Sequence, residues 1–271
     1  MAPPIITLTT DFGLRDPFVG IMKGVILGIC PQARLVDLSH EVAPQDVVEG
    51  ALVLESAIRF FPRGTVHLAV VDPGVGSARR ALGLRAAEQY FVGPDNGLLT
   101  SALSGSEWVA VALEAPGYRL PVASQTFHGR DTFAPAAAHL ASGVPLERLG
   151  PAVTDPQRLR LPDCWIEGED LVGEVVGTDR FGNLITSVRA EHLARLEAGG
   201  AVSVEVEGRG LGRLVTCYED ALEGVPTPIV GSTGRLEVFV RNASARALLG
   251  AERGSPVKVK VRTTRRGSGG A

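Results

Sequence analysis

Hydrophobic residues follow two different periods along the first 150 residues, and the two periods alternate. Short runs rich in β-branched residues predict strands, whereas apolar positions three or four apart predict amphipathic helices. The run at residues 65–71 is almost continuously apolar, as is typical of a parallel strand buried on both faces. Strands are predicted over residues 4–10, 34–38, 65–71, 81–87, 90–92 and 108–113, and helices over residues 17–30, 47–58, 95–103 and 132–141. This alternation predicts a doubly wound α/β domain over residues 1–150.

The pattern changes after residue 150. Three prolines interrupt residues 151–165, which are predicted to be a linker. Short strands separated by glycine-rich turns follow, with one helix expected over residues 190–197. The strands are predicted over residues 170–176, 184–188, 202–206, 236–240 and 257–261. We therefore expect a smaller C-terminal β-barrel or β-sandwich domain over residues 166–265 and a flexible tail over residues 266–271.

The composition is that of a globular protein and argues against several classes of partner. The 271 residues are 45% hydrophobic and 21% charged, which is ordinary for a folded globular chain. The net charge of −3 and the 5% aromatic content argue against a nucleic-acid partner. Three cysteines without a CxxC spacing predict neither a disulfide framework nor a zinc site. The N-terminus lacks the features of a signal peptide and no apolar run reaches about 18 residues, so we expect a cytoplasmic protein without a membrane partner.

Carboxylates follow two of the predicted strands, at the sheet edge where open α/β proteins bind ligands. Asp11, in the sequence TTDFG, can accept two hydrogen bonds from a ribose diol, although an aspartate there is also a common turn cap. Asp72 ends the buried run and precedes a glycine turn with Arg79 and Arg80. Arg79 stands where a dinucleotide fingerprint has its third glycine, so a nicotinamide cofactor is not indicated. A polar site and a capped turn both fit this segment.

Three further segments carry candidate side chains. His128 directly precedes a predicted helix, whose dipole favours a neutral imidazole that can accept a proton. The sequence DRFGN at residues 179–183 is typical of a turn, yet the amide of Asn183 suits an adenine edge. The GSTG turn containing Ser232 can present backbone N–H groups to a carboxylate. The other four histidines have no metal-ligand spacing, and we expect them to be structural and the protein to hold no metal.

Together and in this order, the motifs TTDFG, MKG, PQDVVEGA, FFPRGTVHLAVVDPGVGS, GPDNGLLT, FHGRD and DRFGN resemble the S-adenosyl-L-methionine (SAM) hydroxide adenosyltransferases, or SAM hydrolases. These enzymes are the water-using relatives of the bacterial fluorinase and chlorinase. The likeness runs from about residue 5 to residue 262. It implies hydrolysis of SAM to adenosine and L-methionine, with SAM as substrate and no cofactor. It also implies an α/β N-terminal domain and a β-rich C-terminal domain, which agrees with the hydrophobic pattern.

The resemblance also implies roles for individual residues. The family's catalytic Asp-Arg-His triad falls on Asp72, Arg79 and His128, and its ribose-binding aspartate on Asp11. Its substrate-gripping segment falls on Asp179, Phe181 and Asn183, with a spacing one residue shorter than in the fluorinase, and a methionine contact falls on Ser232, beside a threonine where the fluorinase has arginine. The family further implies a homotrimer with active sites between subunits.

Two alternatives stay open at this point. A SAM-dependent halogenase would release 5′-halo-adenosine, but halogenases replace the Asp and His of the triad, and a carboxylate at Asp72 would repel a halide. A non-catalytic adenosine- or SAM-binding sensor would use the same pocket without needing the triad. Product analysis after incubation with SAM distinguishes all three readings.

Overall fold

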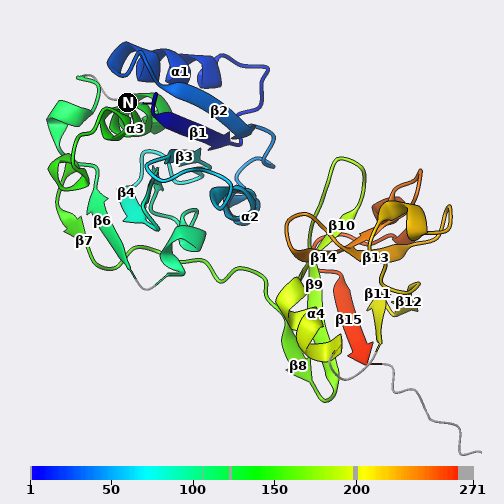
Figure 1. Cartoon of the computed structure of the whole chain (residues 1–271). Helices are drawn as coiled ribbons and strands as arrows, with labels where there is room; N and C mark the ends of the chain where they lie inside the picture. Colours follow the sequence, from blue (N-terminus) through cyan, green and yellow to red (C-terminus); the bar gives the residue numbers. More distant parts are fainter. Residues whose placement is uncertain (1, 106, 122–123, 198–200, 262–271) are drawn as a thin grey trace, which may run out of the picture. The chain divides into compact units, whose positions relative to one another are not determined.

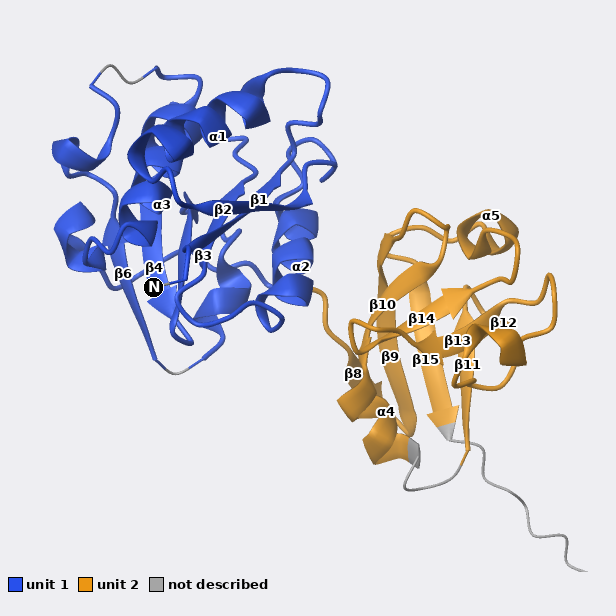
Figure 2. Cartoon of the chain, turned by 45° about the horizontal axis from the view of Figure 1, so that its top comes forward, with its two compact units in different colours: residues 1–160 blue, residues 161–271 orange. Residues whose placement is uncertain are grey.

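The computed structural model describes residues 2–105, 107–121, 124–197 and 201–261, and it consists of two compact units. Unit 1 is Met1–Arg160 and unit 2 is Leu161–Ala271 (Figure 1 and Figure 2). The predicted tail at residues 266–271 lies outside the described residues. Within the described part of the chain, no helix combines the length and the apolar composition that a bilayer crossing requires.

Unit 1 is built on a seven-stranded sheet in the order β2-β1-β3-β5-β4-β6-β7. Its strands are β1 (Ile5–Thr10), β2 (Arg34–Ser39), β3 (Val66–Val70), β4 (Ala81–Ala86), β5 (Gln89–Pro94), β6 (Trp108–Ala112) and β7 (Ala152–Val153). The pairs among β2, β1, β3 and β5 are parallel, whereas β4, β6 and β7 add antiparallel pairs at the other side. Strand β7 falls within the segment that the sequence predicts as a linker.

Helices cover both faces of this sheet, which confirms the predicted α/β architecture. Helices α1 (Phe18–Ile29) and α3 (Ala134–Ala141) pack on one face, where Met22, Ile26 and Phe133 are fully buried. Helix α2 (Val47–Ile58) packs on the other face through Leu54, and Asp46 caps it by accepting a hydrogen bond from the Glu49 backbone N–H at 2.9 Å. The helices therefore fix the sheet from both sides.

Two predicted helices of unit 1 begin later than expected. Residues 95–103 contain only the short 3₁₀ helix η1 (Thr100–Leu103), because the Asn96 side chain donates to the Val71 carbonyl and accepts from the Leu98 N–H, at 2.9 and 3.1 Å. These bonds hold a turn that competes with helix formation. The helix predicted over residues 132–141 is preceded by one π-helical turn, η3 (Gly129–Phe133), and becomes regular at Ala134.

Unit 2 is an eight-stranded sheet in the order β12-β11-β15-β9-β10-β14-β13, with β8 paired to β9. Its strands are β8 (Trp165–Glu167), β9 (Asp170–Thr178), β10 (Leu184–Arg189), β11 (Val202–Val206), β12 (Arg209–Gly210), β13 (Thr227–Val230), β14 (Arg235–Phe239) and β15 (Pro256–Val261). Side chains from strands far apart in this order, β11 and β14, share one core with helices α4 (Ala190–Glu197) and α5 (Ala245–Leu249). The sheet is therefore curled, as expected for a barrel-like domain.

Candidate active site

Parallel pairing brings the two strand-end carboxylates of unit 1 to the same edge of the sheet. Thr10 of β1 is paired with Val70 of β3, so Asp11 and Asp72 both follow adjacent carboxyl ends. This edge is the place where ligands bind in open α/β sheets. The two carboxylates lie at one edge because β1 and β3 are neighbours in the sheet. This placement does not depend on how the loops fold.

Asp72, Arg79 and His128 form one hydrogen-bonded group. Arg79 Nε donates to Asp72 Oδ1 at 2.8 Å, and Arg79 Nη2 donates to Asp72 Oδ2 in the same fork. Arg79 Nη2 also lies 2.9 Å from His128 Nδ1. The side chains of Asp72 and Arg79 are only 5% and 9% exposed, so the two charges neutralise each other largely out of water.

The arginine determines which tautomer His128 adopts. A guanidinium group has only donors, so the contact at 2.9 Å requires Nδ1 of His128 to be an unprotonated acceptor. Burial and then the positive charge of Arg79 lower the pKa of His128, and Asp72 opposes this shift only in part. His128 is therefore neutral at pH 7, with its ring proton on Nε2.

Local packing holds His128 in position. The residue precedes the π-helical turn η3, and a side chain on the next residue, Gly129, would approach the Phe127 ring to 3.0 Å and Met22 Sδ to 3.1 Å. The preceding loop is tied down by the fully buried Asp131, whose Oδ2 accepts from the Ser124 N–H at 2.7 Å. A side chain at position 129 would therefore press on Phe127 and on Met22 of helix α1, and glycine avoids this.

A cavity of about 110 Å³ adjoins the triad. Its walls include Asp72 and His128 together with Val75 and the aromatic rings of Phe12, Phe18 and Phe127. The three rings contact one another with centroids 5.2 to 5.9 Å apart. An apolar wall beside a charged triad excludes bulk water and strengthens the field that the triad exerts on a ligand.

Asp11 lies next to Phe12 but does not line this cavity. Its Oδ2 accepts a hydrogen bond from the Gln45 backbone N–H at 2.8 Å, and Gln45 has a φ of 67°, in the left-handed region. The half-buried carboxylate is thereby fixed in orientation and keeps acceptor positions for a further ligand.

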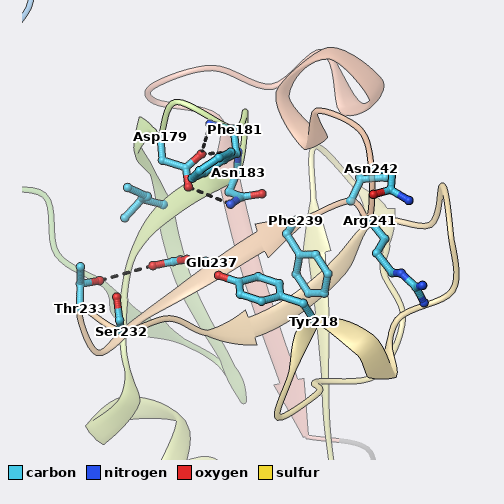
Figure 3. A pocket seen from close by; sticks show the side chains of 12 residues that line it. Asp179, Phe181, Asn183, Tyr218, Ser232, Thr233, Glu237, Phe239, Arg241 and Asn242 are labelled. Carbon is cyan, nitrogen blue, oxygen red and sulfur yellow. Dashed lines mark hydrogen bonds between the residues drawn. The ribbon is translucent and has the colours of Figure 1, made fainter.

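Unit 2 contains a separate cavity of about 490 Å³. Four of the five residues that the family resemblance assigns to substrate binding line it, namely Asp179, Phe181, Asn183 and Ser232 (Figure 3), whereas the fifth, Asp11, belongs to unit 1. Asp179 Oδ1 accepts from the N–H groups of Phe181 and Asn183, both at 2.9 Å, and its Oδ2 accepts from Asn183 Nδ2 at 2.8 Å. The one-residue-shorter DRFGN segment therefore closes as a turn around its own aspartate.

The same cavity contains residues that sequence reasoning missed. Tyr218 and Phe239 pack edge to face with ring centroids 4.7 Å apart, and Glu237 and Arg241 lie on opposite sides of these rings (Figure 3). No motif marks these residues in the sequence. The only signal is the alternation in β14, where Glu237 interrupts the apolar pair Leu236 and Val238.

One group of potential metal ligands occurs among the described residues. Ligand atoms of Asp163, Cys164 and His192 lie within 4.8 Å of one another. Burial raises the pKa of the Cys164 thiol, which lies 2.9 Å from His192 Nδ1 and can donate to it. A thiol–imidazole hydrogen bond accounts for this geometry. His67 is also structural: it bonds Thr7 through Nδ1 at 2.8 Å, and burial lowers its pKa to about 4.

Comparisons with known proteins agree on one family. Residues 6–150 match the SAM hydroxide adenosyltransferase N-terminal domain, and residues 173–258 match the corresponding C-terminal domain. The chain is 46% identical to an (R)-S-adenosyl-L-methionine hydrolase of Thermus thermophilus, with 92% of this chain and 97% of the relative covered. It is 30% identical to a fluorinase of Nocardia brasiliensis, over 95% of this chain and 97% of that protein. A crystal structure of an uncharacterized conserved protein from Thermotoga maritima superposes with a TM-score of 0.89 at 35% identity, covering 94% and 99% of the two chains.

Proposed function

The chain belongs to the SAM hydroxide adenosyltransferase family, and we propose that it hydrolyses SAM to adenosine and L-methionine. The observation that carries this proposal is the Asp72–Arg79–His128 group, in which hydrogen bonds join the loop after β3 to the residue before η3 beside an apolar cavity. A protein that only binds its ligand has no need for a largely buried Asp–Arg pair joined to a neutral imidazole. An enzyme that has to position a water molecule needs such a group.

The chemistry places its main demand on the nucleophile. The sulfonium makes C5′ of the adenosyl group electrophilic, and methionine departs as a neutral thioether, so the leaving group needs no acid. Water forms the new C5′–O bond as the C5′–S bond breaks, and one proton is released for each SAM consumed. The enzyme therefore has to hold a water molecule in line with the C–S bond and stabilise its developing hydroxide character.

The triad can meet this demand without a change of protonation before the reaction. Arg79 is permanently cationic and favours hydroxide character in its neighbourhood. We assign Asp72 to the orientation of Arg79, because it engages both Nε and Nη2. His128 accepts from Arg79 through Nδ1, which leaves Nε2–H as a donor that can orient the water oxygen.

Substrate binding completes the proposal. We assign Asp11 to the ribose diol, Asn183 and Phe181 to the adenine, and Asp179 and Ser232 to the methionine half. Phe181 is 78% exposed and lines the cavity, so its ring is accessible to an adenine. The aromatic pair Tyr218 and Phe239 supplies further apolar area in the same cavity.

The assembly and the location belong to the same proposal. The resemblance of the whole chain implies a homotrimer in which neighbouring copies complete each active site. The mass of the particle by light scattering, compared with 28.4 kDa for one chain, measures this directly. The free cysteines Cys30, Cys164 and Cys217 support a reducing, cytoplasmic environment.

Chromatography of products after incubation with SAM tests the function. Equal amounts of adenosine and methionine, with one proton released per turnover, support the hydrolase. A 5′-halo-adenosine that depends on added halide would instead identify a halogenase. Tight binding of adenosine without turnover would identify a sensor.

A further inference from the structure

His40 is a buried histidine that contacts the loop carrying Asp11 through both its side chain and its backbone. It directly follows strand β2, is 4% exposed, and lies with Nδ1 2.8 Å from the Thr10 hydroxyl at the end of β1. The same hydroxyl accepts a hydrogen bond from the Phe12 N–H at 3.3 Å, and the His40 carbonyl accepts one from the Gly13 N–H at 2.8 Å. These contacts hold the chain on both sides of Asp11.

A series of polar side chains continues from His40 to the surface of unit 1. His40 Nε2 lies 3.0 Å from Asp37 Oδ1, and Lys23, from the MKG segment, donates through Nζ to Asp37 Oδ2 at 2.6 Å. The Lys23 and Asp37 side chains are 31% and 40% exposed, whereas Thr10 at the other end is fully buried. Burial alone would raise the pKa of Asp37, but hydrogen bonds from Lys23 and His40 outweigh it and lower that pKa. Asp37 is therefore an ionised acceptor at neutral pH.

An irregularity in β2 brings Asp37 and His40 together. Residues three apart on a regular strand project to opposite faces. The pairing of β1 with β2 shifts by one residue at this point, since Leu8 is opposite Asp37 and Thr9 is opposite Ser39. An extra residue in one strand redirects the side chains that follow it, as β-bulges beside active sites do. The shift therefore lets the two side chains meet.

One placement of the ring proton satisfies all of these contacts. The Thr10 hydroxyl accepts from Phe12 and keeps its own proton to donate to His40 Nδ1, so the ring proton lies on Nε2 and faces Asp37. An apolar side chain in place of His40 would leave the buried Thr10 hydroxyl without this partner.

We propose that His40 is a positioning residue of the active site, which holds the loop carrying Asp11 in the orientation that binds the ribose diol. Asp37 and Lys23 hold the histidine from its other side. This inference rests on the ribose role proposed for Asp11. The Gln45 N–H fixes one oxygen of the Asp11 carboxylate, and His40 fixes the backbone that carries it. Hydrogen bonds to a diol are directional, so a shift of this backbone weakens them.

Calorimetry of His40→Ala with adenosine and with 2′,3′-dideoxyadenosine tests the proposal. We expect the affinity for adenosine to fall about three- to tenfold, as for residues coupled in one hydrogen-bond network, and the affinity for the dideoxynucleoside to stay the same. In an Asp11→Ala background, His40→Ala should cause no further loss, because His40 acts through Asp11. His139→Ala is the matched control: this partly buried histidine of α3 contacts the Tyr118 ring, and its loss should leave both affinities unchanged.

Two conservative variants identify the contact that matters and serve if His40→Ala does not fold. His40→Asn places an amide where Nδ1 lies, so it can still pair with Thr10 and should restore most of the affinity for adenosine. His40→Gln places its amide near the position of Nε2, facing Asp37, and should not restore it. Rescue by glutamine and not by asparagine would overturn the proposal, because the contact with Asp37 would then be the important one.

An unchanged affinity for adenosine in His40→Ala would also overturn the proposal. Equal losses with both nucleosides would assign His40 to the stability of the fold, and a full further loss in the Asp11→Ala background would show that His40 does not act through Asp11. If SAM yields no adenosine but adenosine binds more tightly than the dideoxynucleoside, the hydrolase proposal alone fails. If the unmodified protein binds the two nucleosides equally, the ribose role of Asp11 and this inference fail together, whether or not SAM is hydrolysed.

Discussion

The charged groups that line the two cavities, one in each unit, are organised in opposite ways. In unit 1, Asp72 and Arg79 are paired through two hydrogen bonds and the arginine reaches His128, so the charges satisfy one another before any ligand arrives. In unit 2, Asp179 is held by its own turn and Glu237 by a single hydroxyl, and neither forms an ion pair with a described residue. The carboxylate of the unit 1 group has its cationic partner within the group, whereas the two carboxylates of unit 2 have none among the described residues.

This difference indicates different roles for the two groups: the unit 1 group positions a reacting molecule, and the unit 2 carboxylates bind a ligand. A preorganised, internally neutral group can act on a reacting atom without reorganising, which is what catalysis requires. An uncompensated pair of carboxylates raises the free energy of the unliganded protein and lowers it again when a cation binds. We therefore expect substitutions in the Asp72–Arg79–His128 group to reduce the rate and the stability, and substitution of a carboxylate in the cavity of unit 2 to reduce affinity while increasing stability.

The largest effect is expected for Arg79→Met. Loss of the permanent cation should lower kcat about 10²- to 10³-fold, because the developing hydroxide loses its main electrostatic partner, while the affinity for adenosine stays the same. Single-turnover rates and calorimetry measure the two quantities. A normal kcat with a raised KM would place Arg79 in recognition and remove the contrast between the units.

Asp72→Ala should cost about 3 kcal/mol of unfolding free energy, since it leaves the Arg79 guanidinium, 9% exposed, without its counter-charge. Urea unfolding of the variant and of Asp72→Ala/Arg79→Met distinguishes the cause. The double variant should recover part of the loss. If the single variant is as stable as the original protein, the pair is not buried in solution.

Asp11→Ala should weaken adenosine binding about tenfold or more, because a ribose diol would lose a charged acceptor. Calorimetry with adenosine and with 2′,3′-dideoxyadenosine measures this contribution, and only the affinity for adenosine should fall. An unchanged affinity for adenosine would refute the ribose role of Asp11.

Glu237→Gln should raise the unfolding free energy of the unliganded protein by about 1 kcal/mol, because it relieves a buried charge and its repulsion with Asp179. Thermal unfolding at pH 8, where the carboxylate is more fully ionised, is the measurement. A lower melting temperature would mean that Glu237 is already compensated, and the contrast between the two units would be lost.

The smallest effect concerns pH. The pKa of His128 is lowered by burial and by Arg79, so the ring becomes protonated only below the usual value of about 6.5. Protonation of Nδ1 would place a donor against the guanidinium and break the triad. The acid limb of kcat should therefore lie below pH 6.5, and an acid limb above that value would contradict the assigned tautomer.

Much of the fold was predictable because it rests on local patterns. The parallel strands β1 and β3 follow from short apolar runs, and the carboxylates that end them mark the ligand edge of the sheet. The seven-residue step from Asp72 to Arg79 is also local, since a glycine turn returns the chain within one loop. His128 was already a candidate because it directly precedes a predicted helix, but only the family resemblance joined it to Asp72 and Arg79.

Other features depended on contacts between distant segments. The bond from Arg79 to His128 spans 49 positions, and His128 directly precedes η3, which packs against helix α1. The 3₁₀ helix η1 replaced a predicted helix because Asn96 bonds to a carbonyl 25 residues away. Neither interaction has a signal in the periodicity of the chain.

The sequence by itself determined where carboxylates follow buried strands, because strand burial and turn chemistry are encoded within a few neighbouring residues. It did not determine which charges would be paired. Along β14 the charged Glu237 stands between the apolar Leu236 and Val238, yet all five residues of the strand are buried. Tyr218, from a separate loop, packs on Phe239 and helps to enclose that face. Whether a buried carboxylate has a cationic partner within the protein depends on which distant segments pack around it, and only the tertiary structure decided this.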